Sequence, residues 1–435
     1  MNPNFHNGWM RRSLATPAIL ALTSFAFSPL TSGQDLIVPS GNTVVYDTAT
    51  SGPINVNRFI IEPSASFIVT GSAPLKISAA SVEIDGRLVA SGFDSTSVPT
   101  LNTTNIPELG ALGSAGGGQG GTGSANTSES TPAGLKGEES FGISFPGIAP
   151  GGGQGGETSF AAQGPNSPDD RRAAGGGGGA LAANQPVSSN PFAPENRGLA
   201  AQAGMDGGAT GTGAISGNAR AAGGLPGLPL FQDSNPNNDF WGTKVTPLGT
   251  IIGEAARPLP GRGGGGGGDA VRSATFPLNP FLVTGDEKGA GGGGGGGLVL
   301  IATRSFRLGP NGRLIANGGD GAGGENLIFF DRVGGGSGGG SGGWIVLDAA
   351  EFDLSSAADA SITTVGGRGG PGFNDRHPGG PFGNDIDGAG GNGGPGVIQL
   401  HVPSGLEGAL NLPSGKTLED ITSPTGHVLL PILPF

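Results

Sequence analysis

Alternating acidic and amide side chains in the segment DSNPNNDFWG have the composition of a cation-binding loop. Asp233, Asn235, Asn237 and Asp239 place oxygen ligands at every second position, as calcium loops do. The sixth position lacks the glycine of an EF-hand, and Lys244 stands where that loop has its bidentate glutamate. The pattern therefore favours a polar turn, and metal binding is left open.

Two further acidic stretches, GGDGAGG around Asp320 and NDIDGAGGNGG around Asp385 and Asp387, contain part of the GGxGxD calcium-roll repeat. A calcium roll repeats that motif every nine residues and places an apolar residue after the aspartate. Neither stretch continues in that way, so ordinary loop carboxylates are the favoured interpretation.

Little in the sequence supports a hydrolase or a nucleotide-binding protein. The histidines that follow the amino-terminal segment are His377, His401 and His427, and Asp375 precedes the first of them by two residues. No GxSxG nucleophile motif accompanies them, and no glycine tract runs into Gly-Lys-Ser/Thr. We predict that the protein is not an enzyme and binds no cofactor.

Charged residues recur on strand-like segments. The favoured interpretation is that these residues form a charged, solvent-exposed face. The alternative is that two of the carboxylates act together as the catalytic pair of a glycan-cleaving enzyme. Sugar stacking needs exposed aromatics, but Tyr46, Trp241 and Trp344 are the non-phenylalanine aromatics after the amino-terminal segment, and we expect Trp344 to cover a rim. The charged set comprises Glu62, Glu83, Arg87, Arg304, Arg307, Arg313, Asp348, Glu351 and Asp353.

Composition limits the class of protein. The 435 residues include 92 Gly, 35 Pro and no Cys, so disulfides and thiolate chemistry are excluded. The formal net charge is -12, which disfavours nucleic acid and anionic membranes as partners.

The amino terminus predicts export. Arg11 and Arg12 precede an apolar run from Leu14 to Phe27, and small residues follow near Gly33. This is the layout of a secretory signal peptide over residues 1–33, and the apolar run is shorter than the roughly 20 residues of a membrane span.

A strand-rich unit repeats along the chain. The segments RFIIEPSASFIVTG, SVEIDGRLVASG, SFRLGPNGRLIANG and EFDLSSAADASITTVG align, and each closes on a glycine. Residues at equivalent positions are Phe59, Val82, Phe306 and Phe352; Ile61, Ile84, Leu308 and Leu354; Phe67, Leu88, Leu314 and Ile362; and the closing Gly71, Gly92, Gly318 and Gly366.

Such repeats predict an all-β fold, a parallel β-helix (solenoid) with long glycine-rich insertions. We expect coils over 34–109, a low-complexity glycine-rich insertion over 110–289, and further coils with glycine-rich loops over 290–435. Every insertion then leaves from the same edge, because each begins after the closing glycine. The unpaired strand edges at the solenoid ends would allow self-association unless they are capped.

The glycine tracts admit two interpretations. They are flexible linkers, or they lie side by side as extended polyglycine-II-like strands that hydrogen-bond to one another. They lack the every-third-glycine period of collagen.

The units LVLIATRSFRLGPNGRLIANGGDGAGG and WIVLDAAEFDLSSAADASITTVGGRGGPG resemble repeats of secreted, glycine-rich bacterial surface proteins of the adhesin-like β-solenoid type. The resemblance implies a secreted or cell-surface structural or adhesive protein without catalytic residues, with an extracellular glycan or an envelope component as partner. The alternatives are a β-helical polysaccharide-binding or polysaccharide-degrading enzyme and a flexible glycine-rich spacer.

Overall fold

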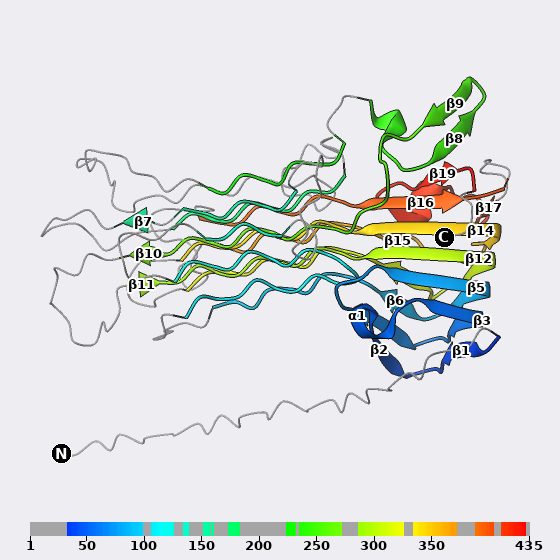
Figure 1. Ribbon diagram of the computed structural model, residues 1–435, viewed down its shortest axis with the longest axis horizontal. Coiled ribbons are helices and arrows are strands. Elements are labelled where there is room, and N and C mark those ends of the chain that lie inside the picture. Colours follow the sequence, from blue (N-terminus) through cyan, green and yellow to red (C-terminus); the bar gives the residue numbers. More distant parts are fainter. Residues whose placement is uncertain are drawn as a thin grey trace, which may run out of the picture.

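The computed structural model combines two parallel β-sheets with a bundle of extended glycine-rich tracts that projects from one side of the sheets (Figure 1). The residues that the structure describes are 33–98, 106–125, 134–138, 151–157, 159–160, 173–182, 223–231, 235–271, 286–325, 334–371, 388–403 and 410–431. Within these residues, no helix is long and apolar enough to span a lipid bilayer.

The larger sheet, sheet A, has eight strands, and all of its strand pairs are parallel. Their spatial order is β1 (Asp35–Val38), β3 (Ile54–Ile61), β5 (Leu75–Ile84), β12 (Leu298–Leu308), β14 (Trp344–Asp353), β16 (Val397–His401) and β19 (His427–Leu429), and β17 (Leu410–Asn411) pairs with β14.

The second sheet, sheet B, has six strands, also paired in parallel. Their spatial order is β18 (Thr422–Ser423), β15 (Ile362–Thr363), β13 (Arg313–Ile315), β6 (Arg87–Val89), β4 (Ser66–Thr70) and β2 (Thr43–Asp47).

The strand register coincides with the repeat alignment. In sheet A, Val82 pairs with both Phe59 and Phe306, and Phe306 pairs with Phe352. In sheet B, Leu88 pairs with Phe67 and Leu314. These side chains are buried in one continuous apolar core to which both sheets contribute. Side chains of successive strand residues alternate between the two faces, so one register places a whole set of apolar residues in the core.

The prediction of a parallel β-helix is wrong. The strands form two separate large parallel sheets, α/β-like in their parallel pairing, and they do not close into a solenoid. Helices are few in the described residues: α1 (Thr48–Ser51) and α2 (Leu418–Ile421) have four residues each. A closed coil needs a short corner after each strand of sheet B, whereas here the chain leaves β6, β13 and β15 for the glycine-rich bundle.

The glycine tracts are hydrogen-bonded to one another, and the tract 261–268 shows how. Its N–H groups donate to three neighbouring tracts in rotation at N···O distances of 2.8–2.9 Å: Gly263 and Gly266 to 134–138, Gly264 and Gly267 to 289–296, Gly265 and Gly268 to 174–180. Its carbonyl groups accept from three others, at 117–124, 151–156 and 335–341. A period of three residues is that of the polyproline II helix. Of the two interpretations of the glycine tracts, these hydrogen bonds favour side-by-side polyglycine-II-like strands over flexible linkers for the described tracts.

These hydrogen bonds arrange the tracts in rows. The first row, 90–98, 316–325 and 363–371, continues outward from β6, β13 and β15, so the insertions do leave from one edge. The second row, 106–115, 289–297, 334–343 and 388–396, runs back, and its last three tracts lead into β12, β14 and β16. A third row holds 116–125, 261–268 and 173–182, and a fourth holds 134–138, 151–157 and 223–230.

Close backbone approach explains the glycine content of the bundle. A Cβ atom on Gly265 would overlap the carbonyl oxygen of Gln154, and one on Gly264 would overlap that of Gly338. Neither carbonyl can withdraw, because both belong to tracts that are hydrogen-bonded on their other sides. Only glycine fits at such positions.

Smaller elements complete the described chain. At the far end of the bundle, β7 (Ser159–Phe160), β10 (Ala270–Val271) and β11 (Asp286–Glu287) form a three-stranded sheet (Figure 1). Nearer the large sheets, the 3₁₀ helix η1 (Pro236–Asn238) precedes the hairpin β8 (Thr243–Thr246) and β9 (Gly249–Ile252). The segment around these elements contributes to a second apolar cluster with sheet A, made of Leu181, Phe231, Ala255, Leu259, Leu298, Leu300, Trp344, Val346 and Val397.

Candidate functional site

A row of charged residues crosses sheet A where strands β5, β12 and β14 lie side by side. The register places Glu83 beside Arg307, Arg307 beside Asp353, and Asp353 beside Asn411 of β17. The intervening Val82, Phe306 and Phe352 are buried in the core. The local alternation of polar and apolar residues thus gives the row its common face.

Ion pairs link this row to the first strands of the sheet. Arg307 contacts Asp85 and lies 3.6 Å from Glu83 (Nη2 to Oε2), and Glu83 lies 3.4 Å from Arg58 (Oε1 to Nη2). Arg58 in turn lies 3.9 Å from Asp35 (Nη1 to Oδ2). Opposite charges therefore alternate from β1 to β12. Most of these side chains are partly exposed, so each pair contributes little alone, and the network mainly favours this register over a shifted one.

Asp353 is held in its ionised form. Hydrogen bonds from Ser355 and Asn411, together with the charge of Arg307, outweigh burial and lower the pKa of the Asp353 carboxyl, with the Ser355 hydroxyl as the largest cause. This direction is opposite to that required of a general acid in glycoside hydrolysis.

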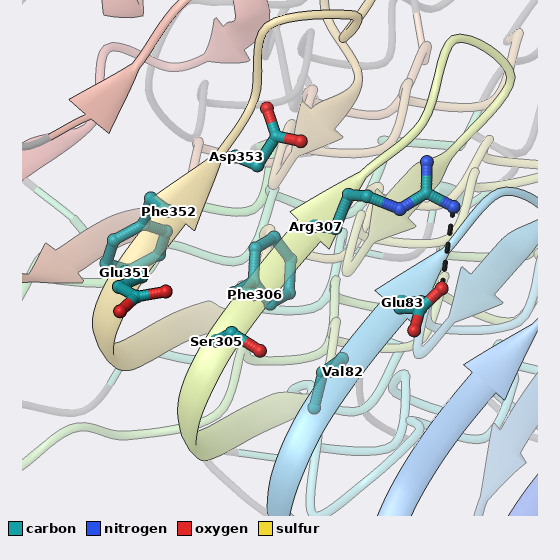
Figure 2. A pocket seen from close by; sticks show the side chains of 8 residues that line it. All are labelled: Val82, Glu83, Ser305, Phe306, Arg307, Glu351, Phe352 and Asp353. Atoms are coloured by element: carbon teal, nitrogen blue, oxygen red, sulfur yellow. Dashed lines mark ion pairs between the residues drawn. The ribbon is translucent and has the colours of Figure 1, made fainter.

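A cavity of about 420 Å³ lies over this row (Figure 2). Polar groups around it include the Ser305 hydroxyl, the Arg307 guanidinium and the carboxylate of Glu351, which faces Ser305 across the β12–β14 pair. The Phe306 and Phe352 rings are buried and pack on each other with centroids 5.8 Å apart, so they offer no exposed stacking platform. The cavity is lined by Val82, Glu83, Ser305, Phe306, Arg307, Glu351, Phe352 and Asp353.

The structure brings together only part of the charged set singled out in the sequence. Glu83, Arg307, Glu351 and Asp353 line the cavity. The remaining charged residues lie elsewhere. Glu62 accepts a hydrogen bond from the Ser40 N–H at 2.8 Å, Arg87 and Arg313 are neighbours in sheet B, Arg304 lies in β12, and Asp348 lies beside His401 on sheet A.

Buried polar side chains form a second cluster on the face of sheet A covered by residues 228–260. The Trp344 Nε1–H donates to the Gln399 side-chain oxygen at 2.6 Å, and the Gln399 amide donates to the Trp241 carbonyl at 2.6 Å. Trp344 is fully buried and packs against Phe231, so the expectation of a rim position is wrong. The cluster ties the covering segment to the sheet.

His401 and His427 lie beside this cluster and are neutral near pH 7. Burial lowers the pKa of His401 to about 4, although the hydrogen bond from Nδ1 to the Leu430 carbonyl acts in the opposite direction. Burial and the nearby charge of Lys244 lower the pKa of His427 to about 4. Asp375 and His377 lie outside the described residues.

The calcium candidates do not converge on a site. Asn235 caps η1 by accepting from the Asn237 N–H, and Asp320 accepts from the Arg368 N–H at 2.7 Å. Asp233, Asp385 and Asp387 lie outside the described residues. In the part of the chain that the structure describes, no group of three or more His, Cys, Asp or Glu residues could hold a metal ion.

Sequence reasoning missed a structural use of polar residues on the first row of tracts. The Asp94 carboxylate accepts from the Asp320 N–H at 2.8 Å, and the Asn317 side chain accepts from the Val365 N–H at 3.0 Å. Each of these side chains thus accepts from the backbone of the neighbouring tract in the first row. The signal was present in the alignment, because Asp94 and Asp320 occupy the same position two residues after a closing glycine.

Comparisons with protein-family models, with curated proteins and with solved structures found no match.

Proposed function

We propose that this protein is an exported, non-catalytic structural or adhesive component of the cell surface or extracellular matrix. The observation that carries the proposal is the glycine bundle, in which backbone hydrogen bonds join tract to tract in several directions. The predicted signal peptide, residues 1–33, lies almost wholly outside the described residues and supports export from its sequence alone.

The bundle suits a load-bearing role. Each interior tract is hydrogen-bonded to several neighbours along its length, so one tract cannot move without breaking bonds to all of them. The same bonds count against a flexible spacer, because a solvated linker leaves its N–H groups to water.

The chemistry of the candidate site also favours a non-catalytic role. Glu83 is engaged with Arg58 and Arg307, and Asp353 accepts hydrogen bonds that stabilise its charge. A glycosidase needs one carboxyl group that stays protonated near neutral pH and a second that is free to act as base or nucleophile.

Polysaccharide binding is the second candidate function, and the cavity over sheet A favours it. Carboxylates, a guanidinium and a hydroxyl around one cavity can hydrogen-bond sugar hydroxyl groups. Glycan or an envelope component is therefore the partner that we propose, and the acidic net charge disfavours nucleic acid.

Self-association through an end of the strand stack is a further proposal. Among the described residues, β1 and β2 are paired on one side only. At the opposite end, α2 and the β8–β9 hairpin lie against the last strands, and the Leu430 N–H donates to the Thr243 carbonyl at 2.8 Å. Among the described residues, the β1 end is therefore the end of the strand stack that leaves strand edges unpaired.

Incubation of the purified protein with a panel of insoluble polysaccharides tests the proposed function. We expect no release of reducing ends from any polymer, and release of them would overturn the non-catalytic role. Where the protein sediments with a polymer, Glu351→Gln in the cavity should weaken binding. The matched change Glu419→Gln, at an exposed carboxylate on α2, should not.

A further inference from the structure

The tract 106–115 carries an exposed aliphatic row. Ile106, Leu109 and Leu112 are 69%, 74% and 53% exposed, and they follow one another at intervals of three residues. Three residues make one turn of the polyproline II conformation, so the three side chains project from one side of the tract at intervals of about 9 Å. Phe93, 43% exposed, lies on the adjoining tract, whose backbone N–H donates to the Leu112 carbonyl.

This row lies at a corner of the bundle. Within the described residues, the tract 106–115 hydrogen-bonds to three others, 90–98, 116–125 and 286–297, and these leave its outer side open. The N–H groups of Ala111 and Ser114 point inward to the Gly292 and Gly295 carbonyls. The tract is thereby fixed in place, and the exposed row is a rigid surface.

The row is uncharged along its length. Glu108, the one charged residue between Ile106 and Leu112, lies 3.7 Å from the Lys288 ammonium (Oε1 to Nζ). Lys288 also donates to the Ile106 carbonyl at 2.8 Å. A basic or acidic partner would therefore gain no ion pair along the row, whereas an apolar surface with the same spacing would bury it.

We propose that the row docks against the same row of a second copy of this chain. Two antiparallel tracts related by a twofold axis would place Leu109 against Leu109 and Ile106 against Leu112. Every side chain then meets an aliphatic partner, because both rows share the same three-residue spacing. A twofold contact is closed and needs only this one surface.

The area fits a weak dimer. The exposed parts of the four side chains amount to roughly 500 Å² per copy, as large as the largest apolar patch of a typical monomer. A pair of copies would bury at most about 1,000 Å² through these side chains, the size of a weak or transient interface. We therefore expect a dimer that forms with increasing protein concentration.

A comparable pair of side chains elsewhere supplies the matched control. Leu225 and Leu228 are 57% and 50% exposed and also three residues apart, on the tract 223–230. Within the described residues, that tract hydrogen-bonds to 173–182 and 151–157, and the Arg262 guanidinium donates to its Leu228 carbonyl. None of these partners is a hydrogen-bonded neighbour of 106–115.

The absence of cysteine allows a direct test by cross-linking. Leu109→Cys should be joined into a covalent dimer by a short bifunctional thiol reagent, because the twofold axis places the two substituted positions opposite each other. Leu225→Cys at the same concentration should remain monomeric. Equal cross-linking of both variants would overturn the proposal, because it would indicate random collision.

Sedimentation velocity over a range of concentrations provides the second test. The unmodified protein should show a monomer–dimer equilibrium, Leu109→Gln should abolish it, and Leu225→Gln should preserve it. Unchanged melting temperatures would establish that the exposed substitutions leave the fold intact. A protein that stays monomeric at all concentrations, or a dimer that survives Leu109→Gln, contradicts the proposal. The second result would direct attention to another surface such as the β1 edge.

Discussion

The parallel sheets and the glycine bundle are stabilised by different atoms, side-chain atoms in the sheets and backbone atoms in the bundle. In the parallel sheets, side chains such as Phe59, Leu308 and Leu354 fill a continuous apolar core. In the bundle, tracts such as 261–268 contact one another through backbone atoms, and a side chain at many of these positions would overlap a neighbouring carbonyl group. The sheets therefore depend on apolar burial, and the bundle depends on hydrogen bonding and close approach.

The comparison shows what a glycine-rich sequence needs in order to be ordered. Glycine loses the most backbone entropy on folding, and each hydrogen bond contributes only about 1 kcal/mol net. A single isolated tract would therefore not stay ordered, because the few hydrogen bonds that it forms do not offset its loss of backbone entropy. The strands of sheet B and sheet A place outgoing and returning tracts side by side, which reduces the entropy lost in bringing them together.

The largest effect should follow from a charge in the side-chain core. Leu354→Asp places a carboxylate at a fully buried position between the sheets, and we expect it to lower the free energy of unfolding by about 4 kcal/mol. Chemical denaturation measures this loss. The matched change Leu248→Asp, at a fully exposed leucine of the β8–β9 hairpin, should alter stability by less than about 0.5 kcal/mol. Equal effects would mean that the two sheets share no core.

Acid should destabilise the sheet region through its buried histidines. His401 and His427 have pKa values of about 4 in the folded protein, against 6.5 as the ordinary value. As the pH falls, these histidines are protonated in the unfolded chain at a higher pH than in the folded protein. Their contribution to stability is therefore complete above pH 6.5 and is lost as the pH falls towards 4. The loss is on the order of 3 kcal/mol for His401.

Melting temperatures measured between pH 7 and pH 4 test this prediction. His401→Gln should flatten the dependence, while His427 maintains the remainder. Asp353 has a lowered pKa, so its contribution is lost at lower pH and does not produce the same slope. An unchanged slope in His401→Gln would contradict the assignment.

A methyl group added inside the bundle should lower the free energy of unfolding by less than the two preceding changes in the sheet region. Gly265→Ala forces a Cβ atom against the Gln154 carbonyl, and we expect a cost of about 2 kcal/mol. Gly323→Ala is the matched control, because its Cβ would lie 3.2 Å from the Pro371 carbonyl oxygen, where a small shift relieves the contact. Thermal unfolding should separate the two variants. If both behave like the unmodified protein, the tracts are not in close contact.

The smallest effect should come from the charged row on sheet A. Arg307→Gln removes the contacts with Glu83 and Asp85, and we expect a loss of about 0.5–1 kcal/mol that shrinks at high salt. Lys416→Gln removes a single exposed pair with Asp359, at 2.6 Å from Nζ to Oδ1, and should cost less. Urea denaturation at low and high salt compares the two, and a larger loss for Lys416→Gln would argue against a network.

The sequence predicted the sheet register well because apolar side chains report it. The equivalence of Phe59, Val82, Phe306 and Phe352 follows from alternation within each strand and is the observed pairing. Closure into a solenoid was wrong, because the alignment of strands does not say how the chain travels between them. The path taken here depends on glycine tracts that carry no side-chain pattern.

The candidate site was predicted only in part. The charges at Glu83, Arg307 and Asp353 were visible as a set, but their neighbours across the sheet depend on register, which brings Asp353 beside Asn411. Trp344 was misplaced because the segment that covers it, residues 228–260, is distant in sequence and shows no period that points to sheet A. The exposed row of Ile106, Leu109 and Leu112 has no sequence signal of its own, since a three-residue spacing places side chains on one side only in a polyproline II helix.

Amide hydrogen exchange of the purified protein tests the packing of the glycine tracts most directly. The N–H groups of Gly263–Gly268 donate to three surrounding tracts, so a peptide covering this tract should exchange as slowly as one covering β12. Exchange at the rate of an unstructured glycine chain, with protection confined to the two sheets, would contradict the bundle.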